Sequence, residues 1–334
     1  MVFFEFKIIS LPNECAGRTA IKSNGDVMNK ARKPILVTGS HRSGTTWTGV
    51  NLSCAPHTGY IHEPFNAAKK ASYSNKAFGY WFQYISEENE LDYKETLDKV
   101  IHFQYPLLGN LTRSRTMRNV ADVFKEQGYT LLHRIRGDTP IIKDPIAFFS
   151  ADWLCKKYNM NVLVLIRHPA AFCSSLMVKN WAFDFNNFLK QELLMDRYLS
   201  AFQNEIQEFA QEEKNIIEQA ILLWNCIHHT VSMYQQDHPE WLFVRHEDLS
   251  RNPLREFASI YREFELEFTS RAQTRILESS GSHNPTEQQA GNEFKRNSRK
   301  NILNWKTRLT SEEIEKIKSE TNNIASELYH DYEW

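Results

Sequence analysis

The chain has 334 residues, of which 41% are hydrophobic and 24% are charged, with a formal net charge of −1. These values are typical of a globular protein with a sizeable core, and they exclude a chain that is disordered over most of its length. The near-neutral charge argues against nucleic acid as the main partner, because neutralising phosphates requires a basic excess.

The cysteines and the apolar runs indicate a cytoplasmic protein. No cysteine pair has the CxxC spacing, so we expect reduced thiols rather than a disulfide framework, and we predict no metal site. No apolar run approaches the roughly 18 residues of a membrane-spanning helix, and no signal peptide is recognisable, so we predict no membrane span. The five cysteines are Cys15, Cys54, Cys155, Cys173 and Cys226.

In chain order, residues 1–33 read as an irregular lead-in, and residues 34–334 as a single α/β domain. Five short apolar runs, each ending in a glycine or in charged residues, predict buried parallel strands joined by helices. Ligands in such sheets bind at the carboxyl ends of the strands. The runs are Ile35–Val37, Tyr60–Ile61, Ile141–Ile142, Val162–Ile166 and Trp241–Val244.

Helical patterns fill the intervals between these runs. Residues 66–140 are expected to form a helical insertion, and the composition of Phe188–Phe209 also favours a helix. Apolar residues at helical spacing predict a helix over Asn215–Met233. Thr310 and Glu313 form a capping box at the start of a last helix that reaches Leu328.

The segment Gly39-Ser40-His41-Arg42-Ser43-Gly44-Thr45-Thr46 follows the first predicted strand and precedes a predicted helix. Glycines and a helix N-terminus present backbone N–H groups to an anion, and the G-x4-G spacing matches a nucleotide-binding P-loop. Thr45, however, stands where P-loop kinases have a lysine that reaches the β- and γ-phosphates. A 5′-phosphate carrying one sulfuryl group has less charge to neutralise, so the loop favours sulfuryl over phosphoryl transfer.

At this point the sequence resembles the sulfotransferases that use 3′-phosphoadenosine 5′-phosphosulfate (PAPS) as donor. Their 5′-phosphosulfate loop is matched by Arg42-Ser43-Gly44-Thr45-Thr46-Trp47, and their 3′-phosphate motif by Arg167 and, eight residues later, Ser175. The segments His62-Glu63-Pro64-Phe65 and Lys143-Asp144-Pro145 resemble bacterial members most. Glu-Pro after the loop also recurs in carbohydrate sulfotransferases. The resemblance implies a three-layer P-loop-like fold around a central parallel sheet.

The resemblance also implies the donor contacts. Arg42, assisted by Thr45 and Thr46, would stabilise charge on the leaving phosphate, and Trp47 would stack on adenine. The basic cluster Lys295–Lys300 is the nearest counterpart of a C-terminal donor-binding motif, with Arg296 and Ser298 as candidate 3′-phosphate contacts. The full predicted donor-binding set is Ser40, His41, Arg42, Ser43, Gly44, Thr45, Thr46, Trp47, Arg167, Ser175, Arg296 and Ser298.

The base that accepts the acceptor's proton is Glu63 or His62. Neighbouring residues of a strand face opposite sides, so we expect only one of the two to face the cleft. The Glu-Pro analogy favours Glu63, whereas an intrinsic pKa near neutrality favours His62. Lys143 and Asp144, at another strand end, could orient either the acceptor or the loop, and His246-Glu247-Asp248 reads as structural.

The predicted function is therefore the transfer of a sulfuryl group from PAPS to a hydroxyl acceptor, a saccharide or glycoconjugate, by in-line attack with Glu63 as base. No metal is required for this chemistry. Residues 66–140 would lie on the acceptor side. Two alternatives remain at the level of sequence: an ATP-dependent P-loop kinase, and a nucleotide-binding protein without catalysis. The sequence does not predict the oligomeric state.

Overall fold

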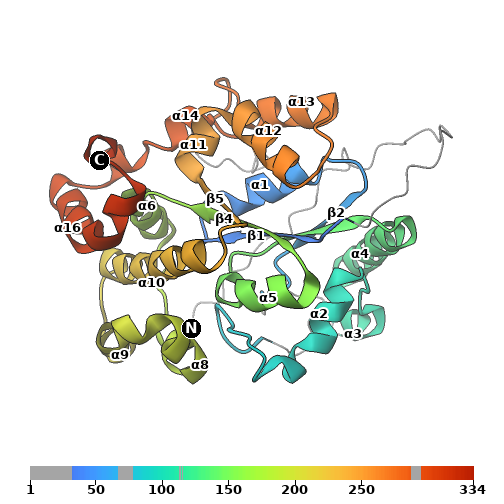
Figure 1. Ribbon diagram of the computed structural model, residues 1–334, viewed down its shortest axis with the longest axis horizontal. Coiled ribbons are helices and arrows are strands. Elements are labelled where there is room, and N and C mark those ends of the chain that lie inside the picture. Colours follow the sequence, from blue (N-terminus) through green and yellow to red (C-terminus); the bar gives the residue numbers. More distant parts are fainter. Residues whose placement is uncertain (1–31, 67–77, 113, 115, 287–294) are drawn as a thin grey trace.

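The computed structural model describes residues 32–66, 78–112, 114, 116–286 and 295–334. Residues 1–31 of the predicted lead-in therefore lie outside the described residues, as do 67–77 of the predicted insertion. A five-stranded sheet with the order β2-β3-β1-β4-β5 occupies the centre, and every strand pair is parallel (Figure 1). The strands are β1 (Ile35–Gly39), β2 (Thr58–His62), β3 (Thr139–Lys143), β4 (Asn161–Ile166) and β5 (Leu242–Arg245).

All five predicted strands are thus confirmed, and their register brings their carboxyl ends to one edge of the sheet. Gly39 pairs with Leu165 of β4, His62 pairs with Lys143 of β3, and β4 ends level with β5. Because the strands are parallel, the loops that follow β1, β2, β3 and β4 all leave from this edge. This geometry explains how charged segments far apart in the sequence come together.

The two faces of the sheet carry separate hydrophobic cores. Leu36, Ile142 and Val164 face one core, which includes residues of α5, α6 and α10. Ile35, Val37 and Leu165 face the other core, which includes residues of α12 and α13. Helices therefore cover both faces, as Figure 1 shows, and the architecture is the predicted three-layer P-loop-like α/β fold.

Helices follow every strand. Between β2 and β3 lie α2 (Lys94–Ile101), α3 (Leu107–Leu111) and α4 (Met117–Arg136). The other α-helices are α1 (Thr45–Leu52), α5 (Ala151–Tyr158), α6 (Pro169–Lys179), α7 (Asn186–Leu189), α8 (Glu192–Leu194), α9 (Gln203–Gln211), α10 (Ile216–Asp237), α11 (His246–Arg251), α12 (Pro253–Glu263), α13 (Ser270–Ser280), α14 (Ser298–Asn301), α15 (Trp305–Arg308) and α16 (Ser311–Leu328).

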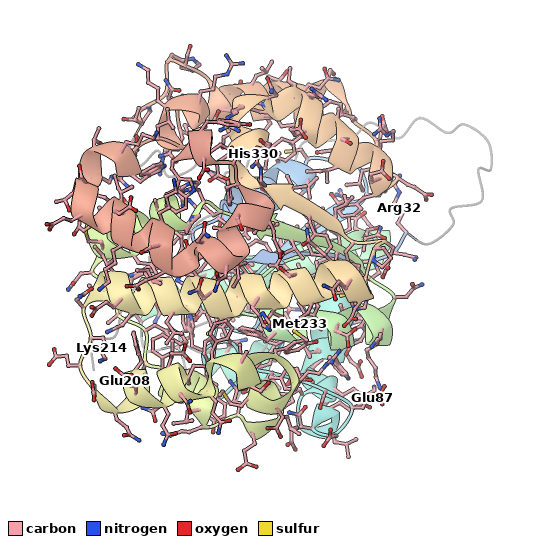
Figure 2. The ribbon with its side chains drawn as sticks, turned by 60° about the vertical axis from the view of Figure 1, so that its left-hand side comes forward. Arg32, Glu87, Glu208, Lys214, Met233 and His330 are labelled. Atoms are coloured by element: carbon pink, nitrogen blue, oxygen red, sulfur yellow. The ribbon has the colours of Figure 1, made fainter. Side chains whose placement is uncertain are left out.

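Two of the predicted helices form, and each begins with a capping box. Thr310 and Glu313 make the capping box of α16, and a second capping box, Asn215 with Glu218, begins α10. The two helices lie side by side in Figure 2. Lys316 of α16 forms an ion pair with Glu218 of α10 at 2.7 Å. The predictions over Asn215–Met233 and up to Leu328 are confirmed.

The prediction of a helix over Phe188–Phe209 is wrong as a continuous element, because the chain there forms short helical pieces, including a π-helical turn at Met195–Leu199. Gln191 interrupts the helix with φ −112° and ψ 81°. Its side chain accepts a hydrogen bond from the backbone N–H of Tyr84 at 2.8 Å and donates to the carbonyl of Phe82 at 3.2 Å. These tertiary hydrogen bonds outweigh the local helix propensity.

Candidate active site

The loop between β1 and α1 depends on two glycines. Gly39 has φ +122°, and a Cβ atom there would lie 2.2 Å from the carbonyl oxygen of Leu165. Gly44 has φ +87°, and its Cβ would lie 2.6 Å from Nδ1 of His246. Only glycine combines this backbone conformation with such close approach. Ser43 tightens the turn, because its hydroxyl donates to the carbonyl of Ser40 at 2.5 Å.

This loop can bind an anion. The helix α1 begins at Thr45, so the first amides of its N-terminal turn have no acceptor within the helix. Its first backbone hydrogen bond onto the loop runs from Thr48 N–H to the carbonyl of Gly44 at 3.0 Å. The buried hydroxyl of Ser40 has no hydrogen-bond partner among the described residues. Amides, a hydroxyl and a helix N-terminus are the donors that a phosphate or sulfate group needs.

The structure brings the two predicted phosphate motifs into contact. Arg42 donates a hydrogen bond from Nε to the hydroxyl of Ser175 at 3.1 Å, and Nη1 of Arg167 donates to the carbonyl of Arg42. The guanidinium of Arg42 also lies 5.5 Å from the ring centre of Trp181. The structure therefore brings together Arg42, Arg167 and Ser175, three residues of the predicted donor-binding set.

The site is strongly positive. Burial and, after it, the positive charges of Arg167, Arg296 and Arg308 lower the pKa of Arg42 to about 10. Burial also lowers the pKa of Arg167, whose Nε has no hydrogen-bond partner among the described residues. Gathering like charges is unfavourable in the absence of an anion, so four guanidinium groups point to a ligand with several negative charges.

Buried contacts hold Arg167 in position. The backbone N–H of His168 donates to the carboxylate of Glu247 at 3.1 Å, and the hydroxyl of Tyr329 donates to the same carboxylate at 2.9 Å. The indole of Trp224 donates to the carbonyl of Arg167 at 2.9 Å. Burial raises the pKa of Glu247. In this arrangement Glu247 fixes the junction of β4 and α6, which agrees with a structural reading of His246-Glu247-Asp248.

Glu63 lies at the end of β2, beside a fully buried lysine. Its carboxylate accepts hydrogen bonds from Nζ of Lys143 and, at 2.9 Å, from the amide of Asn66. His62 lies on the same side, with Nε2 3.8 Å from the carboxylate of Glu63. The alternation expected of a strand does not separate the two residues, because β2 ends at His62 and Glu63 adopts φ +45°.

Asp144, the other residue left open by the sequence, has a structural contact pattern. Its carboxylate accepts backbone hydrogen bonds from Phe65 at 2.7 Å and from Ile146 at 2.9 Å. Burial and the negative charge of Glu63 raise its pKa to about 7. Asp144 therefore ties the segment after β2 to the segment after β3, and it fixes the backbone on both sides of the Glu63–Lys143 pair.

Two loop residues of the predicted donor-binding set pack against aromatic side chains. The ring of His41 lies 5.1 Å from that of Phe172 and 5.9 Å from that of Phe82, and burial followed by the charge of Arg42 lowers its pKa to about 3. The ring of Trp47 lies 5.3 Å from Phe257, and its Nε1 donates to the hydroxyl of Ser279 at 2.9 Å. Thr45 is buried and Thr46 half-buried.

The C-terminal candidates differ in placement. Arg296 lies near enough to Arg42 to lower its pKa. The buried hydroxyl of Ser298 donates to the backbone carbonyls of Ser250 at 2.8 Å and Ser280 at 3.3 Å. These contacts hold the start of α14 against α11 and α13.

Sequence reasoning missed two residues of this site. Trp181 follows α6 and stacks on Arg42, and Arg308 adds a charge from α15. Neither lies in a motif, so no sequence signal identified them. Within the described part of the chain, no group of three or more His, Cys, Asp or Glu side chains could hold a metal ion. No helix among the described residues is long and apolar enough to cross a membrane.

Comparison with solved structures finds sulfotransferase domains at low sequence identity. The domain from the curacin biosynthetic pathway is 14% identical, covering 89% of this chain and 97% of its own, with a TM-score of 0.47. The domain from the Synechococcus PCC 7002 olefin synthase is 13% identical, covering 93% and 99%, with a TM-score of 0.44. Sulfotransferase STF9 from Mycobacterium avium is 13% identical, covering 88% and 76%, with a TM-score of 0.41.

A search of curated proteins finds no match. The family model of the sulfotransferases, in contrast, matches residues 34–270. This segment is more than half of the chain, and it contains the phosphate loop, the Glu63–Lys143 pair and the Arg167–Ser175 motif. The chain therefore belongs to the sulfotransferase family.

Proposed function

We propose that the protein transfers a sulfuryl group from PAPS to a hydroxyl of a carbohydrate, with Glu63 as the base. The observation that carries the donor assignment is the contact between Arg42 and Ser175, at 3.1 Å, with Arg167 bound to the same loop. A 5′-phosphosulfate on the loop and a 3′-phosphate at Arg167 and Ser175 would then occupy adjacent parts of one site.

The residues fit such a donor. The unpartnered Ser40 hydroxyl and Arg167 Nε are buried hydrogen-bond donors that a bound anion would satisfy. The bound donor supplies the sulfuryl group and a phosphate leaving group. Arg42 and the N-terminal amides of α1 stabilise negative charge at the loop. Thr45, in place of the P-loop lysine, leaves no cation at the position that kinases use.

Glu63 is suited to receive the acceptor's proton. A carboxylate must be ionised to act as a base, and the ammonium of Lys143 favours the ionised form of Glu63. The Lys143 and Asn66 contacts fix both carboxylate oxygens of Glu63. His62 lies close enough to adjust the charge around Glu63.

A nucleotide-binding and turnover experiment tests this assignment. We expect the wild type to bind 3′,5′-adenosine diphosphate more tightly than ATP with Mg²⁺, measured by calorimetry. Glu63→Gln should lower kcat by about 100-fold or more while the Kd for the nucleotide changes little, because the base acts only on the acceptor. The exposed Glu88→Gln is the matched control and should keep full activity. Glu63→Gln leaves Lys143 without its ion-pair partner, so thermal unfolding is measured to check that the variant still folds.

Tighter binding of ATP with Mg²⁺ would favour the kinase alternative. Full turnover by Glu63→Gln would remove Glu63 as the base. Nucleotide binding without turnover on any hydroxyl acceptor would favour a binding protein without catalysis.

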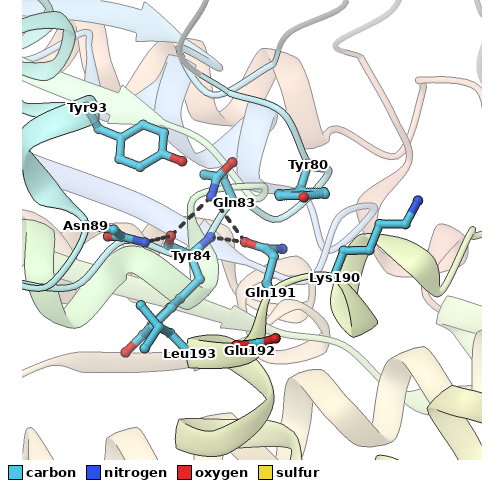
Figure 3. Close-up of a pocket in the computed structure, with 9 residues that line it drawn as sticks. All are labelled: Tyr80, Gln83, Tyr84, Asn89, Tyr93, Lys190, Gln191, Glu192 and Leu193. Atoms are coloured by element: carbon cyan, nitrogen blue, oxygen red, sulfur yellow. Dashed lines mark hydrogen bonds between the residues drawn. The ribbon is translucent and has the colours of Figure 1, made fainter.

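The carbohydrate class is supported by a cavity of about 230 Å³ (Figure 3). It is formed by the segment after residue 79 and the turn around Gln191, and its lining combines the tyrosines Tyr80 and Tyr93 with Asn89 and Lys190. Aromatic faces and polar groups together suit a sugar ring, which has an apolar face and a hydroxyl edge. The same segment carries Phe82, whose ring lies 5.9 Å from that of His41 of the phosphate loop.

Truncating Tyr93 tests this cavity. With a saccharide acceptor, Tyr93→Ala should raise KM by about tenfold, while the Kd for 3′,5′-adenosine diphosphate stays the same. Tyr332→Ala, whose side chain is 81% exposed, is the matched control and should change neither value. An unchanged KM for every accepted saccharide would place the acceptor elsewhere.

A further inference from the structure

The short helix α15 lies beyond the segment matched by the family model, yet it packs beside the start of α6. The buried Trp305 stacks on His168, with ring centres 5.1 Å apart and ring planes 10° apart. His168 directly follows Arg167, so this stack fixes α15 beside the junction of β4 and α6 that carries Arg167. Arg308 is three residues after Trp305 and therefore lies on the same side of the helical turn.

The charge of Arg308 acts on both halves of the phosphate site. It lowers the pKa of Arg167, after the larger effect of burial, and it lowers the pKa of Arg42 together with Arg167 and Arg296. Arg308 is half-buried and belongs to the same group of guanidiniums. Its position on α15, against α6, places it on the side of Arg167 and Ser175 rather than on the side of Glu63.

We propose that Arg308 binds the 3′-phosphate of the donor together with Arg167 and Ser175, and that it makes the protein select nucleotides with a 3′-phosphate. This inference rests on the proposed function. A donor with a 3′-phosphate and a 5′-phosphosulfate carries about four negative charges at neutral pH. The four arginines match that number. A guanidinium is also the side chain best suited to bind a phosphate through two parallel hydrogen bonds.

The test compares two nucleotides that differ only in the 3′-phosphate, namely 3′,5′-adenosine diphosphate and adenosine 5′-monophosphate. We expect Arg308→Ala to lose about tenfold or more in affinity for the diphosphate and little for the monophosphate, because hydrogen bonds to charged groups are strong. Arg308→Lys keeps the positive charge but not the two parallel N–H donors of the guanidinium, so its affinity for the diphosphate should fall less. The control Arg262→Ala removes an exposed guanidinium that contacts only Ser259 and Glu263 of its own helix among the described residues, and it should bind both nucleotides as the wild type does.

Several outcomes would overturn the inference. An equal loss for both nucleotides would mean that Arg308 acts as a general charge, and an unchanged affinity for the diphosphate would mean that it does not contact the ligand. If the wild type itself bound both nucleotides equally, the proposed donor would be wrong and this assignment would fail with it. Should Arg308→Ala not fold, as judged by thermal unfolding, the selective loss in Arg308→Lys decides the question.

Discussion

The two residues proposed for the chemistry share an unusual backbone conformation. Arg42 has φ +67° and Glu63 has φ +45°, in the left-handed region that non-glycine residues seldom adopt. Arg42 lies in the turn after β1, and Glu63 directly follows β2. The guanidinium of Arg167 donates a hydrogen bond to the backbone carbonyl of Arg42, and the backbone N–H of Glu63 donates to the carbonyl of Lys143. Strain of this kind persists where the surrounding structure fixes it, and it is common at functional sites.

Asp144 should make stability depend on pH. Its pKa of about 7 in the folded protein is far above its ordinary value of 3.8, because of burial and the nearby Glu63. Between these two values the folded state holds a proton that the unfolded state has lost. The free energy of unfolding should therefore fall as pH rises from about 4 to 7, by at most about 1.4 kcal/mol per pH unit.

Urea unfolding at several pH values checks this prediction against Asp144→Asn. The variant cannot titrate at residue 144, so its stability should fall less steeply with pH. Its absolute stability should also be about 1–3 kcal/mol lower, because an amide cannot accept both backbone N–H groups, of Phe65 and of Ile146, through two oxygens. Equal slopes for the two proteins would contradict the raised pKa.

At the scale of elements, the strands were predictable because each buried run ends in glycine or charged residues. Parallel strands then bring these ends together, so His62, Lys143 and Arg167 could be assigned to one edge. The capping box of α16 was predictable for a similarly local reason, because Thr310 and Glu313 lie three residues apart. The interrupted helix at Gln191 was not, because hydrogen bonds to residues more than a hundred positions away decide it.

The site was predictable where a motif spans few residues and not where side chains meet across elements. Arg42, Arg167 and Ser175 carry recognisable spacing. The Glu63–Lys143 ion pair joins two strand ends, and the pairing depends on register, which the sequence alone did not specify. Arg308 reaches the site only because Trp305 stacks on His168, a contact between segments more than a hundred residues apart.

For the whole molecule, the strand order explains how the site is divided. With β1 in the middle, β3 and β2 lie on one side of the phosphate loop and β4 on the other. Glu63 and Lys143 therefore lie on one side of the loop, and Arg167 and Ser175 on the other. The proposed base and the proposed 3′-phosphate site thus lie on opposite sides of the loop that would hold the reacting group.

The positive charges that favour donor binding also lower the stability of the ligand-free protein. Variants of Arg42 measure both effects. Burial and three other arginines lower the pKa of its guanidinium, which is still charged at neutral pH. Holding this charge in the folded protein therefore lowers the free energy of unfolding below about pH 10. Arg42→Gly removes the charge and suits φ +67°, but it loses the Ser175 hydrogen bond and the Trp181 contact. We expect a net gain of about 1 kcal/mol, or a rise in Tm of about 2 °C.

Thermal unfolding with and without 3′,5′-adenosine diphosphate measures both of these effects. At a concentration of 100 times Kd the nucleotide should stabilise the wild type by about 2.7 kcal/mol, whereas Arg42→Gly should gain far less at the same concentration. Arg42→Ala is the matched control, since it removes the same charge but keeps a side chain at φ +67°. The difference between the two variants then isolates the backbone, and the shift they share reports the loss of the charge together with the Ser175 and Trp181 contacts. A lower Tm for ligand-free Arg42→Gly than for the wild type would show that the Ser175 and Trp181 contacts outweigh the repulsion among the arginines.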